Sequence, residues 1–136
     1  MPNFSIEKSI AVEAPASQVW RVFTDPILSR QMGGEYISEW EVGSSFGWRG
    51  LDGRMLTQGR IMKIEPEKLL QHTLLNSIGA TNSVITYELE EKDDITVLHA
   101  REDFTNPIPV DEYADASEGW DTALQALKDT AERHRE

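Results

Sequence analysis

The last stretch of the chain, residues 111–135, restricts the fold more than any other part because its pattern is that of one long amphipathic helix. Apolar side chains recur there at steps of three and four residues, and charged side chains fill the positions between them. The apolar positions are Tyr113, Ala116, Trp120, Leu124, Leu127 and Ala131. A helix of this length runs roughly 35 Å at about 1.5 Å per residue, which is comparable with the width of a small sheet. We therefore expect the rest of the chain to supply a sheet that packs against this helix.

The first part of the chain predicts one strand followed by two short helices. Apolar and polar residues alternate over residues 4–12, which is typical of a half-buried strand. A proline then stops this strand and suits the first turn of a helix. Asp25 and Pro26 are the cap and first-turn pair of a second, shorter helix, and Gly33-Gly34 supplies its left-handed exit. The chain should therefore turn sharply at the end of the second helix and continue directly into the strands that begin at residue 36.

From residue 36 to residue 104 the apolar period falls to two, and turn residues such as Asp52-Gly53 separate the segments as in successive hairpins. The expected strands are residues 36–42, 45–49, 55–64, 69–75, 84–90 and 95–104. The segment 106–109 contains two prolines and should leave the sheet, because proline has no N–H for the strand ladder. Gly119, inside the final helix, costs roughly 1 kcal/mol relative to alanine. We expect strand backbone to approach it closely.

These elements predict a single α+β domain over residues 1–136, with seven antiparallel strands curved around the C-terminal helix and two short helices between the first two strands. The first residues lack a basic and apolar signal segment, and no stretch is long enough to cross a bilayer, so we expect a cytoplasmic protein. The formal net charge of -11 repels phosphate backbones and anionic lipid. Nucleic-acid and membrane partners are therefore not expected.

Familiar catalytic and metal-binding patterns are absent from the sequence: there is no nucleophile elbow, zinc-protease helix or phosphate-binding loop, and no cofactor is expected. His72 and His99 fall on strands that a third strand separates, which places them about 10 Å apart. Zinc ligands converge within about 2 Å of the ion, so we expect no metal site. The polar strand residues that remain for acid–base chemistry, or for plain pairing on a solvated face, are His72, Tyr87, His99, Arg101 and Glu102. Strand alternation places His99 and Arg101 on one face and Glu102 on the other.

Several short motifs keep a characteristic order and spacing along the chain. They are Ala14-Pro15 with residues 19–26, then 42–46, 52–54, 59–61 and 65–69, and finally Glu118-Gly119-Trp120 with Leu124 and Leu127. In these motifs the chain resembles the homologues of the activator of heat-shock protein 90 ATPase, within the START-like, birch-pollen-allergen-like (SRPBCC) superfamily. The resemblance covers nearly the whole chain and implies a helix-grip fold with a cavity between sheet and helix. Members of this superfamily bind lipids, sterols and aromatic products, or act as polyketide cyclases and aromatases. The resemblance therefore implies either binding of such a molecule or catalysis of this type.

The aromatic residues favour binding of a small hydrophobic or aromatic molecule between the C-terminal helix and the concave sheet. The residues expected to line this site are Trp20, Tyr36, Trp40, Trp48, His72, Tyr87, His99, Trp120 and Leu124. Plain core packing is the alternative for each aromatic side chain. Two further functions stay open: a cyclase- or aromatase-type enzyme that uses the same cavity, and a protein-interaction module on a chaperone, as the family name implies. Because no catalytic set is recognisable, we favour binding without catalysis.

Overall fold

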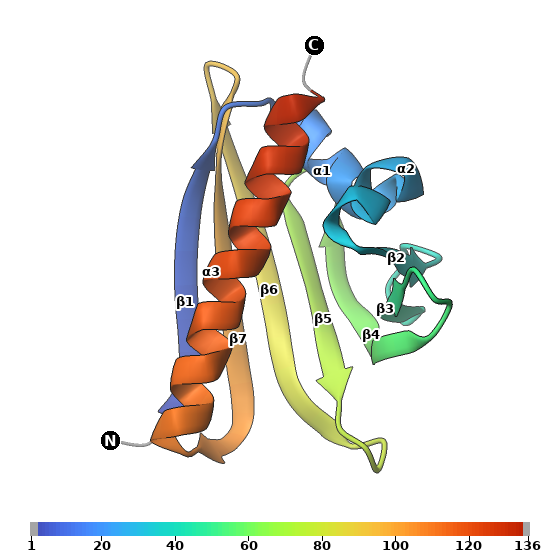
Figure 1. The fold of residues 1–136 in the computed structure, drawn as a ribbon, viewed down its shortest axis with the longest axis vertical. Coiled ribbons are helices and arrows are strands. Elements are labelled where there is room, and N and C mark those ends of the chain that lie inside the picture. The colour runs from blue at the N-terminus through green and yellow to red at the C-terminus, as the bar shows by residue number, and fades with distance from the viewer. Residues whose placement is uncertain (1–2, 135–136) are drawn as a thin grey trace.

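The computed structural model describes residues 3–134 and places its helices over one face of a curved sheet (Figure 1). The strands are β1 (Asn3–Val12), β2 (Gly34–Ser38), β3 (Ser45–Gly50), β4 (Met55–Glu65), β5 (Leu69–Leu75), β6 (Thr81–Lys92) and β7 (Ile95–Ile108). The helices are α1 (Ala16–Thr24), α2 (Pro26–Ser29), the short 3-10 helix η1 (Arg30–Met32) and α3 (Val110–Arg133). The predicted order of one strand, short helices, six strands and a long helix is therefore confirmed.

The strands form one antiparallel sheet in the order β1-β7-β6-β5-β4-β3-β2. Each strand from β2 to β7 pairs with its neighbour in the chain, and β1 closes the other edge by pairing with β7. Figure 1 shows α3 lying diagonally across β1 and β7, while β2, β3 and β4 curl forward beside α2. This arrangement is the seven-stranded helix-grip fold that the sequence predicted.

The two short helices have the local signals that the sequence predicted. The Asp25 side chain accepts a hydrogen bond from the backbone N–H of Ile27 at 3.0 Å, and Pro26 occupies the first turn of α2. Gly33 has a φ of 104°, a left-handed conformation that ends η1. The chain can therefore turn at once from η1 into β2.

Helix α3 is buried along its C-terminal half only. Leu124 and Leu127 are 4% and 3% exposed, and Ala131 is fully buried, whereas Val110 is 77% exposed. The described helix begins one residue before the predicted start and ends at Arg133. Residue 135 of the predicted helix and the side chain of Phe4 lie outside the described part of the chain. Within that part, no helix is both long enough and apolar enough to cross a bilayer.

Two glycines show where the fold needs a missing side chain and where it does not. A Cβ atom at Gly59 would lie 1.7 Å from the backbone oxygen of Thr73, so only glycine permits this approach of β4 to β5. A Cβ atom at Gly119 would meet no atom within 4 Å. The expectation of close strand backbone beside Gly119 is therefore wrong, because this side of α3 faces open space.

Two predicted strand ends also differ from the structure. The strand expected over residues 36–42 ends at Ser38, because Trp40 has a φ of 58° and leaves the extended conformation. Strand β7 continues through Pro107 to Ile108, which pairs with Asn3 of β1 beside a register shift. A sheet accepts proline at such irregularities and edges. The chain therefore leaves the sheet after Ile108 and not at residue 106, where the sequence predicted the end of the strand.

Candidate functional site

Aromatic rings from four strands, β2, β3, β5 and β6, meet rings from helices α1 and α3 on the concave face of the sheet. The ring of His72 stacks on Phe46 with centroids 4.0 Å apart, and Tyr87 contacts Phe23 at 4.9 Å. Trp120 of α3 reaches this group by an edge contact with Tyr87 at 5.8 Å. The connected rings, which we call the inner cluster, are Trp20, Phe23, Tyr36, Trp40, Phe46, Trp48, His72, Tyr87 and Trp120.

His72 brings a polar atom into this apolar environment. Its residue is 2% exposed, and Nδ1 lies 3.0 Å from the backbone oxygen of Thr73. Because a carbonyl oxygen only accepts, Nδ1 carries the hydrogen and Nε2 is left as an acceptor. Burial lowers the pKa of His72 to about 4, although the bond to Thr73 opposes this shift. His72 is therefore a neutral imidazole near pH 7.

Glu102 places a carboxylate on the same face. It is 8% exposed on β7 and accepts hydrogen bonds from Ser83 Oγ at 2.6 Å and from Trp120 Nε1 at 2.8 Å. The bond to Trp120 connects α3 to the sheet. Burial raises the pKa of Tyr87, and the neighbouring Tyr36 and Glu102 raise it further. Tyr87 therefore keeps its hydroxyl proton and remains a hydrogen-bond donor.

A strained loop holds Trp40 at the border of the inner cluster. Its φ of 58° is unusual for a bulky side chain, and such conformations cost about 1–3 kcal/mol unless neighbours impose them. Ser38 Oγ accepts the backbone N–H of Trp40 at 3.0 Å, and Ser44 Oγ lies 3.3 Å from Ser38 Oγ. The Trp40 ring meets Phe46 edge-on at 5.7 Å. The two serines thus hold the loop so that this indole covers Phe46.

The structure brings together most of the residues predicted for the site. The inner cluster contains Trp20, Tyr36, Trp40, Trp48, His72, Tyr87 and Trp120. Leu124 is buried in the core on α3. His99 lies on the other face of β7, where Nδ1 is 2.7 Å from Ser9 Oγ and Nε2 is 3.5 Å from Glu90. Glu102 is the inward polar residue that the predicted ligand-binding set lacks, although the sequence named it among the polar strand residues that could serve acid–base chemistry.

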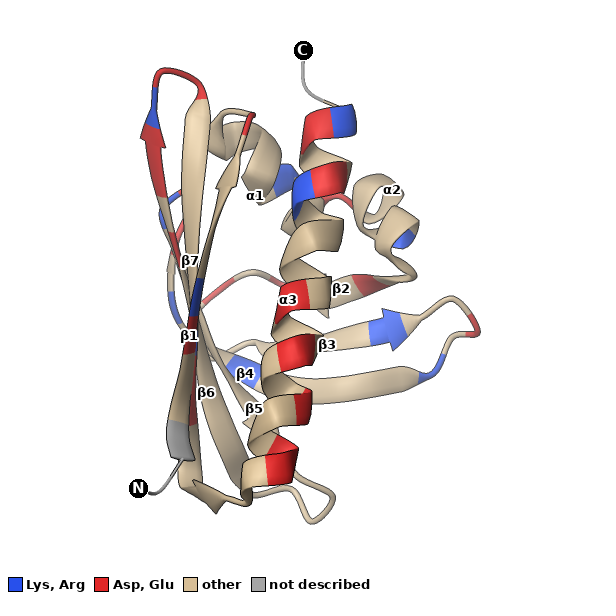
Figure 2. Ribbon diagram, turned by 60° about the vertical axis from the view of Figure 1, so that its left-hand side comes forward, with Lys and Arg blue, Asp and Glu red and all other residues tan. Residues whose placement is uncertain are grey.

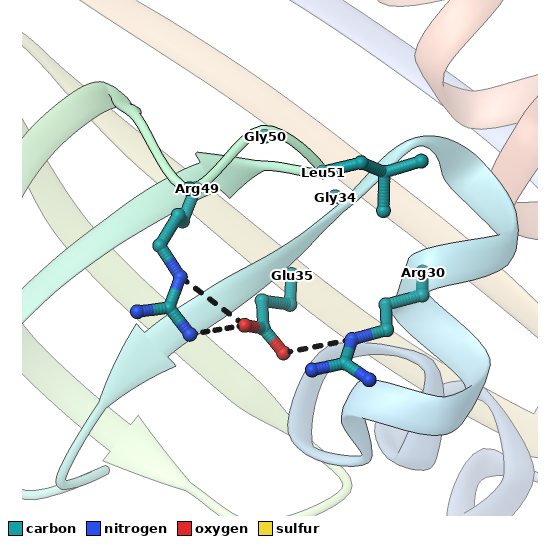
Figure 3. Close-up of a pocket in the computed structure, with 7 residues that line it drawn as sticks. Arg30, Gly34, Glu35, Arg49, Gly50 and Leu51 are labelled. Carbon is teal, nitrogen blue, oxygen red and sulfur yellow. Dashed lines mark hydrogen bonds and ion pairs between the residues drawn. The ribbon is translucent and has the colours of Figure 1, made fainter.

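A separate pocket of about 340 Å³ lies against η1 and the β2–β3 hairpin (Figure 3). Glu35, 6% exposed, sits between two arginines there: Arg49 donates Nε to Glu35 Oε1 at 3.2 Å, and Arg30 Nε lies 3.3 Å from Oε2. The Arg49 hydrogen bond, with the charge of Arg30, lowers the pKa of Glu35 against the effect of burial. The sequence did not predict this pocket because its three charged residues come from three different elements, η1, β2 and β3. Within residues 3–134, no group of three His, Cys, Asp or Glu side chains is arranged to hold a metal ion.

The model of a known family, described as activator of Hsp90 ATPase homolog 1-like protein, matches residues 13–132. The chain belongs to this family. The match includes every strand from β2 to β7 and almost all of α3, so the activator-like region contains the whole inner cluster and the outer pocket. No curated protein matches the chain significantly.

Solved structures have the same fold as this member of the activator-like family. Protein MLL2253 from Mesorhizobium loti aligns with a TM-score of 0.81 at 20% identity over 97% of this chain and 99% of its own. DynU16, from the dynemicin biosynthetic locus, aligns with a TM-score of 0.84 at 21% identity, and the match covers 98% of this chain but 49% of DynU16. The Aha1 dimer from Colwellia psychrerythraea aligns with a TM-score of 0.76 at 19% identity over 96% of this chain and 97% of its own. At these identities the likeness establishes the fold alone.

The inner face of this activator-like domain combines apolar ring surface with a small set of fixed polar atoms. The acceptor is Nε2 of His72, the donors are the hydroxyl groups of Tyr36 and Tyr87, and Glu102 adds a carboxylate. Such a mixture can orient a flat molecule that carries one or two polar substituents.

Proposed function

We propose that the protein binds a small hydrophobic or aromatic molecule on the concave face of the sheet, against Trp120 and the inner cluster. The observation that carries this proposal is that His72 Nε2 and the hydroxyl groups of Tyr36 and Tyr87 make no hydrogen bond within residues 3–134, and none of these three atoms is sealed from solvent. Polar atoms within an aromatic environment normally find a partner. A ligand with complementary polar atoms would provide one.

The N-terminal half of α3 supports this location. Trp120 is half-buried although it packs against the core, and no residue between Val110 and Ala123 is buried. This part of the apolar stripe is therefore less covered than its continuation at Leu124 and Leu127. Incompletely covered apolar surface beside fixed polar groups is typical of small-molecule sites.

The test is displacement of an anilinonaphthalene dye by small aromatic compounds, measured by fluorescence. We expect saturable dye binding that Trp120→Ala reduces strongly while near-ultraviolet circular dichroism shows an intact fold. Val110→Ala is the matched control on the same helix, because Val110 is 77% exposed and lies outside the inner cluster. Equal dye binding by the parent and a folded Trp120→Ala protein would contradict the proposal.

A second candidate is acid–base catalysis of the cyclase or aromatase type in the same place. The observation that favours it is the convergence of a neutral imidazole, two protonated phenols and a carboxylate on one face. His72→Phe would then abolish turnover of a linear poly-β-ketone while retaining dye binding, as followed by mass spectrometry of the products. Unchanged turnover in His72→Phe would exclude the imidazole as the catalytic base.

A third candidate is the chaperone partnership that the family description suggests. The exposed side of α3 carries a run of carboxylates (Figure 2), namely Asp111, Glu112, Asp115, Glu118 and Asp121. Such a surface would accelerate association with a basic partner at low ionic strength. Lack of binding to Hsp90, and of any stimulation of its ATPase at low salt, would count against this function.

A further inference from the structure

The outer pocket has three charged side chains held in a fixed arrangement. Arg30 from η1, Glu35 from β2 and Arg49 from β3 meet where the end of η1 faces the β2–β3 hairpin (Figure 3). The remaining lining comes from Leu51 and from three residues without side chains, Gly34, Gly50 and Gly53. We propose that this pocket binds a small organic anion, whose carboxylate or phosphate group is held by Arg30 and Arg49.

The hydrogen bonds of the two arginines leave donors for such a ligand. A guanidinium has five N–H groups. Glu35 accepts hydrogen bonds from Nε and one terminal nitrogen of Arg49. Arg30 pairs with it through Nε alone. Within residues 3–134, the other terminal nitrogens of both side chains have no acceptor, and Figure 3 shows that of Arg49 directed away from Glu35. Fork-shaped guanidinium groups match the paired oxygens of carboxylate and phosphate.

Glu35 acts as a positioning residue in this arrangement. Its side chain is 8% exposed, whereas those of Arg30 and Arg49 are 59% and 42% exposed. The buried carboxylate therefore holds two partly exposed guanidinium groups in place before any ligand arrives, which lowers the entropic cost of binding. Two arginines against one glutamate also leave a local charge of +1, although the whole chain carries -11.

A second acidic group beside this pocket, Asp52, is itself paired. A Cβ atom at Gly50 would lie 3.3 Å from Asp52 Oδ1, so this carboxylate stands beside the pocket wall. Asp52 Oδ2 accepts a hydrogen bond from Arg54 Nε at 2.9 Å, and the Asp52–Arg54 pair is neutral overall. The excess of positive charge at Arg30 and Arg49 is therefore retained.

The three glycines of the lining give part of the pocket a wall of bare backbone. A Cβ atom at Gly34 would lie 2.5 Å from the backbone oxygen of Arg49 and 2.7 Å from the Trp48 ring. No side chain fits there, so bare backbone lines this side and an indole supports it. Leu51, which is 70% exposed, adds apolar surface at the pocket. The preferred ligand is therefore an anion with a small apolar part.

Nuclear magnetic resonance titration at constant ionic strength tests this site directly, with inorganic phosphate and succinate as separate probes and chloride as the balancing ion. We expect saturable shifts of the Gly34, Gly50 and Gly53 amide signals, with a dissociation constant on the order of 1 mM for at least one probe. The probe that binds more tightly identifies the head group. An absence of saturable shifts with both probes would overturn the proposal.

Variants separate the pocket from general charge effects. Arg30→Gln and Arg49→Gln should each weaken binding about tenfold or more, because each removes charge-assisted hydrogen bonds. Arg49→Lys keeps the charge and the pairing with Glu35 but loses the fork, so it should weaken binding even if Arg49→Gln does not fold. Lys63→Gln removes an exposed positive charge on β4, outside the pocket lining, and should bind as the parent does. Equal weakening by Lys63→Gln would show non-specific attraction and overturn the site. None of the residues that line this pocket belongs to the inner cluster, so a failed titration here leaves the proposed function untouched.

Discussion

The two halves of α3 continue one apolar stripe but end in different environments. In the C-terminal half, Leu124, Leu127 and Ala131 are buried where α3 packs against β1 and the short helices. The N-terminal half leaves Tyr113 and Trp120 half-buried, and Trp120 reaches the sheet through the carboxylate of Glu102. We call the C-terminal half, residues 122–133, the closed half, because it contributes buried apolar surface. We call the N-terminal half, residues 110–121, the open half, because its rings are incompletely covered and its polar anchor is the Trp120–Glu102 hydrogen bond. The comparison separates the part of the helix that stabilises the fold from the part available to a ligand.

The largest expected effect is the loss of stability when the closed half is truncated. Leu127→Ala should lower the free energy of unfolding by about 3 kcal/mol, because it removes buried methyl groups and leaves a cavity. Val110→Ala in the open half should change it by less than about 0.5 kcal/mol. Urea unfolding followed by circular dichroism measures both values. Similar losses from the two variants would remove the distinction between the halves.

The inner cluster beneath the open half should make stability depend on pH. The unfolded chain takes up a proton at His72 near the ordinary pKa of 6.5, whereas the folded protein does so only near 4. Protonation therefore favours the unfolded state, and stability should fall by about 2 kcal/mol from about pH 7.5 to about pH 5.

This contribution is fully present above pH 6.5 and is lost progressively as the pH falls towards 4. His72→Phe should flatten the dependence over that window, as measured by urea unfolding at several pH values. His99→Gln alters a histidine on the outer face and should retain the slope of the parent. A parent-like slope in His72→Phe would show that His72 does not cause the dependence.

A smaller effect is expected from the polar anchor of the open half. Trp120→Phe keeps an aromatic ring but removes the donor that Glu102 accepts at 2.8 Å. We expect a loss of about 1–2 kcal/mol, because hydrogen bonds to charged groups contribute about that much and Ser83 still satisfies part of the carboxylate. Thermal unfolding measures the change. Dye affinity reduced less by Trp120→Phe than by Trp120→Ala would assign the binding to ring surface rather than to the anchor.

The smallest expected effect has the opposite sign. Gly119→Ala should stabilise the protein by about 0.5–1 kcal/mol, because the added methyl group meets no atom within 4 Å and glycine is the weaker helix former. Gly59→Ala is the matched contrast, since its Cβ atom would collide with the backbone of Thr73. Comparison of melting temperatures tests both. Destabilisation by Gly119→Ala would mean that the open half is packed more tightly than its contacts indicate.

Particular residues show how far the sequence alone could predict the site. Alternation along one strand placed His99 and Glu102 on opposite faces of the sheet, because parity is a local property. The rule could not say which of the two faced the helix, and the predicted set took His99, whereas Glu102 is the one bonded to Trp120. The pocket at Arg30, Glu35 and Arg49 was missed because it depends on where η1 lies relative to the hairpin.

The sequence by itself determined the order and type of the elements, since period, capping and turn chemistry act between residues close along the chain. The tertiary structure alone decided which part of the apolar stripe is covered and which inward polar atoms are paired. Trp120 and Leu124 belong to the same predicted stripe, yet one remains half-buried and the other is 4% exposed. The physical reason is that burial and pairing depend on the opposing element, and its position follows only from the packing of the whole chain.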